Sequence, residues 1–160
     1  MRNRHSKDVQ VATYEAPGWG VGEVYLEDDR LLHHELPSAR PAKESALHPL
    51  AERFCRYFEG APDDFADVEI DLVGATAFQR AVTEALRAVP YGETVTYGEL
   101  AALAGHPNAQ RAAGTFCAGN RFAIVVPCHR VVAAGDLGSY GSLGLEYKRR
   151  LLALEGHEPL

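Results

Sequence analysis

The sequence predicts a two-part fold, with an α/β part over residues 1–73 and a mainly helical part containing a helix-turn-helix over residues 74–160. Two patterns predict it: short strand-like runs fill the first part, whereas helix-capping boxes and helically spaced apolar residues fill the second. Composition agrees, because 46% hydrophobic residues in a chain of 160 are enough for a packed core.

Three strands are expected at the start of the first part, over residues 9–14, 21–26 and 31–36. The breaks between them carry the turn-forming pairs Pro17-Gly18 and Asp28-Asp29. This arrangement predicts a small antiparallel sheet.

One helix and a further strand complete the first part. Apolar residues recur at helical spacing from Leu47 to Phe58, and Gly60 ends that helix. Residues 68–72 alternate between apolar and acidic types, which predicts a strand with one wet face. The adjacent pair His33-His34 suggests a metal site, but no Cys or further His stands at ligand spacing, so none is expected.

Two capping boxes open the second part. Thr76-x-x-Gln79 begins a helix that Pro90 ends, and Thr96-x-x-Glu99 begins a short helix. A third helix is expected over about 109–118, joined to the second by a tight turn that contains glycine, which is typical of a helix-turn-helix. The third helix is made mostly of small residues, so it could pack closely on another helix or approach the floor of a nucleic-acid groove.

Net charge and composition limit the function classes. The net charge is −6, which disfavours a general nucleic-acid coat, although residues 91–160 carry six basic and six acidic residues and are neutral overall. We expect any polyanion to bind this second half. No run approaches the ~20 apolar residues of a membrane span, and Met1–Lys7 lacks the apolar stretch of a signal peptide.

Three cysteines, Cys55, Cys117 and Cys128, do not form a disulfide framework, and a free reactive thiol favours the cytoplasm. Cys128 is the chemically suggestive one. It lies in Pro127-Cys128-His129, directly after an apolar run over 122–126 that predicts a buried strand. A thiol attacks as thiolate, and a neighbouring His commonly lowers its pKa. Most cysteines, however, are simply small buried hydrophobes.

Further motifs accompany the Cys-His pair in a fixed order. They are Pro-Tyr-Gly-Glu-Thr-Val-Thr-Tyr-Gly-Glu-Leu-Ala at 90–101, Gln-Arg-Ala-Ala-Gly at 110–114, Asn120, Gly138, Tyr140 and Lys-Arg-Arg-Leu-Leu-Ala-Leu-Glu-Gly at 148–156. From about Gly74 to Gly156 the chain resembles the O6-alkylguanine-DNA alkyltransferase family. The resemblance implies DNA repair by direct, irreversible transfer of an alkyl group, such as methyl, from guanine O6 to a cysteine, once per chain.

The resemblance also implies the residues of the reaction. Cys128 would attack, His129 would act as the base, and Glu155 would orient His129 in a triad. Tyr97 would contact the extruded nucleotide and donate a hydrogen bond to guanine N3. Without the resemblance, Tyr97 would be taken as a core tyrosine and Glu155 as a solvated surface residue.

DNA contacts are implied for the small-residue helix, which in the family lies in the minor groove of double-stranded DNA. The residues concerned are Arg111, Ala112, Gly114, Thr115, Asn120 and Arg121. Arg111 would fill the gap left by the flipped O6-alkylguanine nucleotide. Asn120 would tie the turn around Cys128 to that helix. Arg121 replaces the usual Pro and adds a positive charge.

A base pocket is implied from Val131, Tyr140, Gly141 and Ser142, although the loop at 139–144 is spaced differently from familiar family members. The zinc ligands of some members have no counterpart here, so we expect no metal and no cofactor. The chain is expected to act as a monomer on DNA, without a membrane.

Three other function classes compete with this one. A damage-binding relative without transfer activity would lack the nucleophilic cysteine, and Cys128 is present. A Cys-His hydrolase would need an oxyanion hole and would leave Tyr97 and Arg111 without a role. A regulator that reads the major groove would want Arg, Asn or Gln at several base-facing positions.

Overall fold

The computed structural model describes residues 8–43 and 45–157. The expectation about Met1–Lys7 therefore lies outside the described residues. Two compact units divide the chain, the first reaching to Asp71 and also containing Arg121–Ala123, the second made of 72–120 and the residues from 124 onward. Within the described parts of the chain, no helix is long and apolar enough to cross a membrane.

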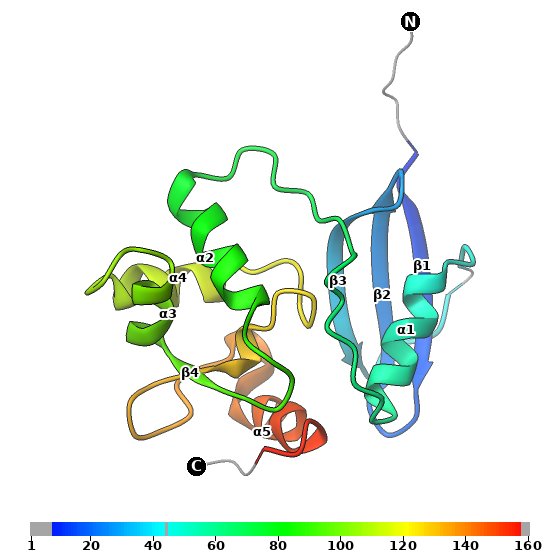
Figure 1. The fold of residues 1–160 in the computed structure, drawn as a ribbon. Helices are drawn as coiled ribbons and strands as arrows, with labels where there is room; N and C mark the ends of the chain where they lie inside the picture. The colour runs from blue at the N-terminus through cyan, green and yellow to red at the C-terminus, as the bar shows by residue number, and fades with distance from the viewer. Residues whose placement is uncertain (1–7, 44, 158–160) are drawn as a thin grey trace, which may run out of the picture. The chain divides into compact units, whose positions relative to one another are not determined.

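The first unit is built on a three-stranded antiparallel sheet, as expected. Its strands are β1 (Gln10–Ala16), β2 (Gly20–Glu27) and β3 (Arg30–Ser38), in the order β1-β2-β3 (Figure 1). Asp28 and Asp29 both have positive φ, 52° and 64°, which suits the tight turn between β2 and β3.

One helix, α1 (Pro49–Phe58), packs against β1 and β2 of the sheet (Figure 1). His48 caps it through Nδ1, which accepts from Leu50 N, and Pro49 stands in its first turn. Phe54 and Tyr57 of α1 join Phe65 in an aromatic core that is fully buried.

The strand expected over 68–72 is wrong, because only Ile70 forms an isolated parallel bridge, with Leu31. Two backbone bonds make this bridge, from Leu31 N to Glu69 O (2.8 Å) and from Asp71 N to Leu31 O (2.9 Å). Three residues further along β3, His34 forms a bridge with Phe122 of another segment. Residues 68–72 therefore cannot extend their pairing along this edge of the strand.

The second unit is mainly helical. It contains α2 (Ala77–Arg87), α3 (Tyr97–Leu103), α4 (Gln110–Ala118) and α5 (Gly144–Leu154), with a two-stranded parallel ladder of β4 (Val95–Thr96) and β5 (Val131–Val132). Both expected capping boxes are formed, at Thr76 and at Thr96. Helices α3 and α4 pack on each other across a turn in which Gly105 and Asn108 have positive φ.

The buried strand expected over 122–126 is also wrong. The run is buried or half-buried, but it bends through turns, and Ile124 adopts a left-handed φ of 74°. Its start bridges to β3 at His34, and the Asn120 side-chain amide donates to Val126 O at 2.8 Å. These two attachments turn the chain, which then enters a 3₁₀ helix, η1 (Cys128–Arg130).

Candidate active site

Cys128 begins η1 and is 6% exposed. Burial, and next the neighbouring thiol of Cys117, raise the pKa of the Cys128 thiol well above its usual value, while the Asn120 side chain and the Lys148 charge oppose the rise. Desolvation of the thiol therefore outweighs the cationic influence on its pKa. Cys128 rests as a thiol and must lose its proton when it reacts.

His129 is fully buried and contacts Glu155, with Nε2 and Oε2 only 2.7 Å apart. Burial lowers the pKa of His129 despite this partner, so the ring is neutral near pH 7. A carboxylate can only accept, so Nε2 carries the hydrogen and Nδ1 carries the lone pair. The lone pair can take a proton, as a general base does.

Glu155 also accepts hydrogen bonds from Arg130 and Gly92. Arg130 reaches it with both arms, Nε to Oε1 and Nη2 to Oε2, each at 2.9 Å, and Gly92 N donates to Oε1 at 3.1 Å. Burial opposes the charge, but the His129 bond and the Arg130 guanidinium hold the pKa of Glu155 well below its usual range. Glu155 is thus a buried, fixed carboxylate and not the solvated surface residue that its position alone suggests.

Arg130 was missed in the sequence analysis. It is buried, donates from Nη1 to Val89 O at 2.8 Å, and lies with its guanidinium 5.8 Å from the Tyr91 ring. The sequence could have indicated Arg130, because it directly precedes the apolar residues Val131 and Val132. A charged residue that is buried with such neighbours needs a partner of opposite charge.

Lys148 opens the motif at 148–156, but the sequence predicted no role for it. It is fully buried on α5, and its Nζ donates to Val131 O at 2.6 Å and to Ser139 O at 3.1 Å. Burial lowers its pKa, although the two thiols, Cys117 and Cys128, oppose this. Its spacing could have revealed it, since the buried Leu151 and Leu152 follow three and four residues later on the same helix face.

Tyr97, the first residue of α3, lies half-buried between several of these groups. The Lys148 ammonium is 5.9 Å from its ring centroid, and a side chain at Gly138 would lie 3.0 Å from its hydroxyl. Burial raises the pKa of Tyr97, with Cys117 and Cys128 adding to the rise. The Tyr97 hydroxyl therefore stays protonated and can donate.

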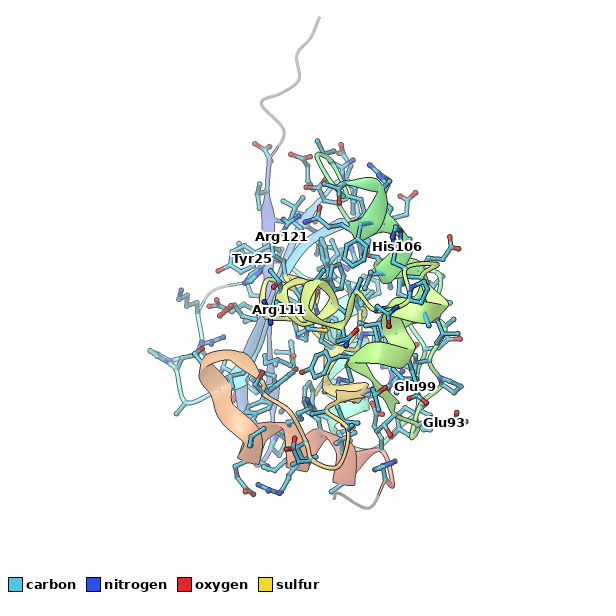
Figure 2. All side chains as sticks on the ribbon, turned by 90° about the vertical axis from the view of Figure 1, so that its left-hand side faces the viewer. Tyr25, Glu93, Glu99, His106, Arg111 and Arg121 are labelled. Atoms are coloured by element: carbon cyan, nitrogen blue, oxygen red, sulfur yellow. The ribbon has the colours of Figure 1, made fainter. Side chains whose placement is uncertain are left out.

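The implied DNA-facing residues of α4 are mostly accessible. Arg111, which is labelled in Figure 2, is exposed, and so are Ala112 and Thr115. The Thr115 hydroxyl donates to Arg111 O at 3.2 Å. Gly114 is half-buried, and a side chain there would lie 3.9 Å from the Tyr97 ring. One face of α4 is thus free for a partner while the other approaches Tyr97.

Arg121 belongs to the first unit, labelled in Figure 2. Its guanidinium donates to Leu32 O (3.0 Å) and Asp71 O (3.2 Å) and lies 4.8 Å from the Phe122 ring. The positive charge of Arg121 was expected to face DNA, and its guanidinium is already bonded to two backbone carbonyls of the first unit.

The implied pocket residues fall on two elements. Val131, in β5, is buried and supplies the carbonyl that Lys148 binds. Tyr140 is half-buried and stacks on Tyr147 with ring centroids 6.4 Å apart, and burial raises its pKa. Gly141 and Ser142 are exposed in a short 3₁₀ helix, η2 (Gly141–Leu143).

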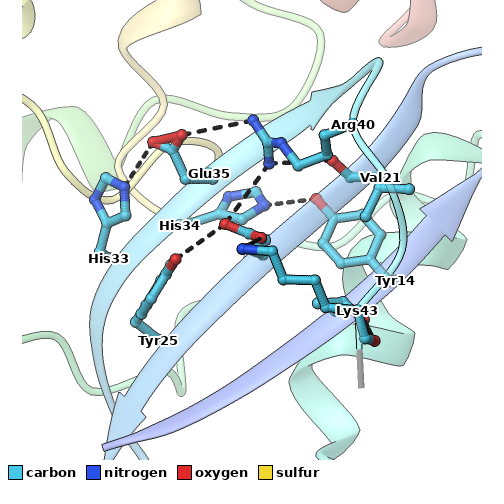
Figure 3. Close-up of polar contacts among 10 residues, drawn as sticks. Tyr14, Val21, Tyr25, His33, His34, Glu35, Arg40 and Lys43 are labelled. Atoms are coloured by element: carbon cyan, nitrogen blue, oxygen red, sulfur yellow. Dashed lines mark hydrogen bonds and ion pairs between the residues drawn. The ribbon is translucent and has the colours of Figure 1, made fainter. Parts of the chain in front are cut away.

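The histidine pair of β3 has two separate environments. His33 Nε2 lies 2.7 Å from a Glu35 oxygen at the surface, whereas His34 is buried (Figure 3). Among the described residues, no group of three or more His, Cys, Asp or Glu side chains is placed to hold a metal ion.

These features define a class: a thiol protein with a buried Cys, a charge-supported His and an accessible small-residue helix nearby. The model of the 6-O-methylguanine DNA methyltransferase, DNA binding domain, matches residues 77–157, half of the chain. The chain therefore belongs to the O6-methylguanine-DNA methyltransferase family.

Relatives and solved structures agree. A methylated-DNA--protein-cysteine methyltransferase of Methanopyrus kandleri is 48% identical over 71% of this chain and 83% of its own length. One from Mycolicibacterium paratuberculosis is 51% identical over 68% of this chain and 65% of its own length. The crystal structure of Mycobacterium tuberculosis O6-methylguanine methyltransferase, covering 92% of this chain and 93% of its own, superposes with a TM-score of 0.75 at 35% identity.

The M. tuberculosis protein has also been solved in complex with DNA. That structure covers 91% of this chain and 92% of its own, with a TM-score of 0.75 at 35% identity. The fold of the chain is thus that of this family over nearly its whole length.

Proposed function

We propose that this chain repairs DNA by moving an alkyl group from O6 of guanine onto Cys128. The observation that carries the proposal is the buried chain of contacts from Arg130 through Glu155 to His129, next in sequence to a buried thiol. Such a chain fixes the tautomer and orientation of His129, which is what a general base needs.

The reaction balances without a cofactor. The Cys128 proton passes to His129 Nδ1, directly or through one water, and the sulfur attacks the alkyl carbon. The new S–C bond forms as the C–O6 bond breaks, and the electron pair goes to the guanine. The Tyr97 hydroxyl, which stays protonated, donates toward guanine N3 and so limits the charge on the leaving base. Nothing in the site cleaves the thioether, so each chain acts once.

Lys148 supports this step from the floor of the site. It binds the carbonyls of Val131 and Ser139 and so holds the backbone that leads to the implied pocket residues. Its positive charge also favours the thiolate of Cys128 as that anion forms.

DNA would be bound by α3 and α4 acting as a helix-turn-helix, with α4 in the minor groove. The exposed Arg111 and the small neighbours Ala112 and Gly114 allow close approach of α4 to a groove. Extrusion of the damaged nucleotide costs a few kcal/mol, and less where the base pair is damaged. Arg111 would then fill the place that this nucleotide leaves in the base stack.

We propose that the chain acts as a monomer in the cytoplasm. We also propose a domain boundary near residue 73.

The test is a transfer assay. Duplex DNA carrying O6-methylguanine with a labelled methyl group is incubated with the protein, and label on protein and DNA is followed. Stoichiometric movement of label to the protein supports the proposal. Binding without movement of label would support the damage-binding alternative, and turnover of ester or amide substrates would support the hydrolase.

A further inference from the structure

Residues Arg121–Ala123, here called the strap, lie in the chain between the end of α4 and Cys128. They belong to the first compact unit, although the residues before and after them belong to the second. Only four residues, 124–127, separate the strap from Cys128. Where the strap is held therefore bears directly on where the nucleophile lies.

The strap is held at β3 by His34. His34 N donates to Arg121 O at 2.9 Å, and His34 Nδ1 lies 2.7 Å from Ala123 O. A carbonyl oxygen can only accept, so Nδ1 carries the hydrogen. His34 thus binds the first and the last residue of the strap, one through its backbone and one through its ring.

The ring of His34 is fixed on its other sides as well. Its Nε2, which must then hold the lone pair, accepts from the Tyr14 hydroxyl at 2.6 Å, drawn in Figure 3. The ring also stacks on Phe54 with centroids 3.8 Å apart and planes 10° apart. The imidazole is 3% exposed, and burial lowers its pKa to about 3, so it stays neutral at physiological pH.

The residue directly after the strap is strained. Ile124 is buried with φ of 74°, a left-handed conformation that a β-branched residue rarely adopts. Such a conformation is costly and persists only where its surroundings hold it. The bond from His34 to Ala123 O holds one side of this turn, and the bond from Asn120 to Val126 O holds the other.

We propose that His34 is a positioning residue for alkyl transfer: through its Nδ1–H bond to Ala123 O it holds the strained turn that sets the place of Cys128. This proposal rests on the proposed function and gives the first unit a part in the reaction. It makes no use of His34 as an acid, a base or a ligand.

The test compares two amide substitutions of similar size. In His34→Asn the side-chain NH₂ reaches the place of Nδ1 and can still bind Ala123 O. In His34→Gln the amide reaches the place of Nε2, which keeps the Tyr14 contact and loses the strap. The matched control is His33→Gln, one residue away, whose ring lies 2.7 Å from Glu35 Oε1 and 5.6 Å from the centroid of the Tyr25 ring.

The rate of reaction with free O6-benzylguanine is measured well below the melting temperature of each variant, together with its pH dependence. One lost hydrogen bond of about 1 kcal/mol corresponds to roughly a fivefold change. We expect His34→Gln to be about fivefold or more slower than His34→Asn, with a shifted pH profile, and His33→Gln to match the wild type. A His34→Gln rate and pH profile equal to those of His34→Asn would overturn the proposal.

Amide hydrogen exchange separates this proposal from the proposed function. In His34→Gln, exchange over residues 123–128 should rise relative to His34→Asn, whether or not the protein transfers alkyl groups. If the wild type transfers no label but this difference appears, the proposed function fails and the strap account stands. If exchange over 123–128 is the same in both variants, the strap account fails.

Discussion

Replacing Glu155 by Gln should separate the two roles of this carboxylate, one in folding and one in the reaction. The substitution removes the charge that binds both arms of Arg130 and leaves a buried guanidinium without its counter-ion. Loss of one member of a buried pair costs about 3–5 kcal/mol. The free energy of unfolding should fall by that amount, as measured by urea denaturation at pH 7.

The same substitution should slow alkyl transfer. The amide stabilises the imidazolium of His129 less than the carboxylate does, so His129 becomes a weaker base. General-base catalysis contributes about 10²–10⁴-fold, and we expect a loss near the lower end because the base itself remains. With a weaker base beside it, the Cys128 thiol should ionise at a higher apparent pKa than in the wild type. The transfer rate should therefore rise at higher pH, as measured in single-turnover assays at a temperature where the variant is folded.

Two further variants make this test decisive. Adding Arg130→Met to Glu155→Gln removes the unpaired charge, so stability should partly recover while the slow transfer remains. The control Glu146→Gln changes an exposed carboxylate of α5 and should alter neither quantity. A folded Glu155→Gln protein with the wild-type rate and pH profile would refute the role assigned to Glu155.

Three other outcomes follow from the same contacts. Arg111→Ala should slow repair in duplex DNA roughly tenfold to a hundredfold, because stacking of this kind contributes about 1–3 kcal/mol, and should leave the reaction with free O6-benzylguanine unchanged; equal losses on both substrates would make Arg111 structural. Asn120→Ala removes the bond to Val126 O and should slow the free-base reaction, measured beside the exposed amide control Gln110→Ala. Because folding lowers the pKa of Glu155 from its ordinary value of 4.5, the ionised carboxylate stabilises the folded state at pH values above 4.5. Urea denaturation should show this part of the free energy of unfolding being lost as the pH falls below 4.5, and Glu155→Gln should not show that loss.

Local patterns predicted much of the fold. Both capping boxes formed, since each depends only on hydrogen bonds between residues that are three positions apart in the sequence. The hairpin at Asp28-Asp29 likewise depends on neighbouring residues alone. The strand expected over 122–126 failed because an apolar run signals burial and not backbone shape. The turn that forms instead is bonded at Ala123 O to His34, far away in sequence.

The candidate site was predicted unevenly for the same reason. The resemblance supplied Cys128, His129 and Glu155, and the structure joins the last two by a hydrogen bond. It did not supply Lys148 or Arg130, whose partners are distant in the chain. The rise in the Cys128 pKa comes mainly from burial, and adjacency in sequence to His129 says nothing about desolvation.

The other two cysteines differ in their value as unreactive controls for Cys128. Cys55 is half-buried, and its thiol donates to Glu15 O at 3.2 Å in the first unit. Burial raises the pKa of Cys55, so it is a sound unreactive control. Cys117 instead raises the pKa of Cys128 from close by, so it is not an independent control.

The central claim is that one thiol, Cys128, accepts one alkyl group. It is tested most directly by incubating the protein with excess O6-methylguanine duplex and locating the methyl group by peptide mass analysis. We predict one methyl group per chain, on Cys128, and none in Cys128→Ser, which should still bind DNA. Methylation of Cys55 or Cys117, or consumption of more than one equivalent of substrate per chain, would contradict the mechanism.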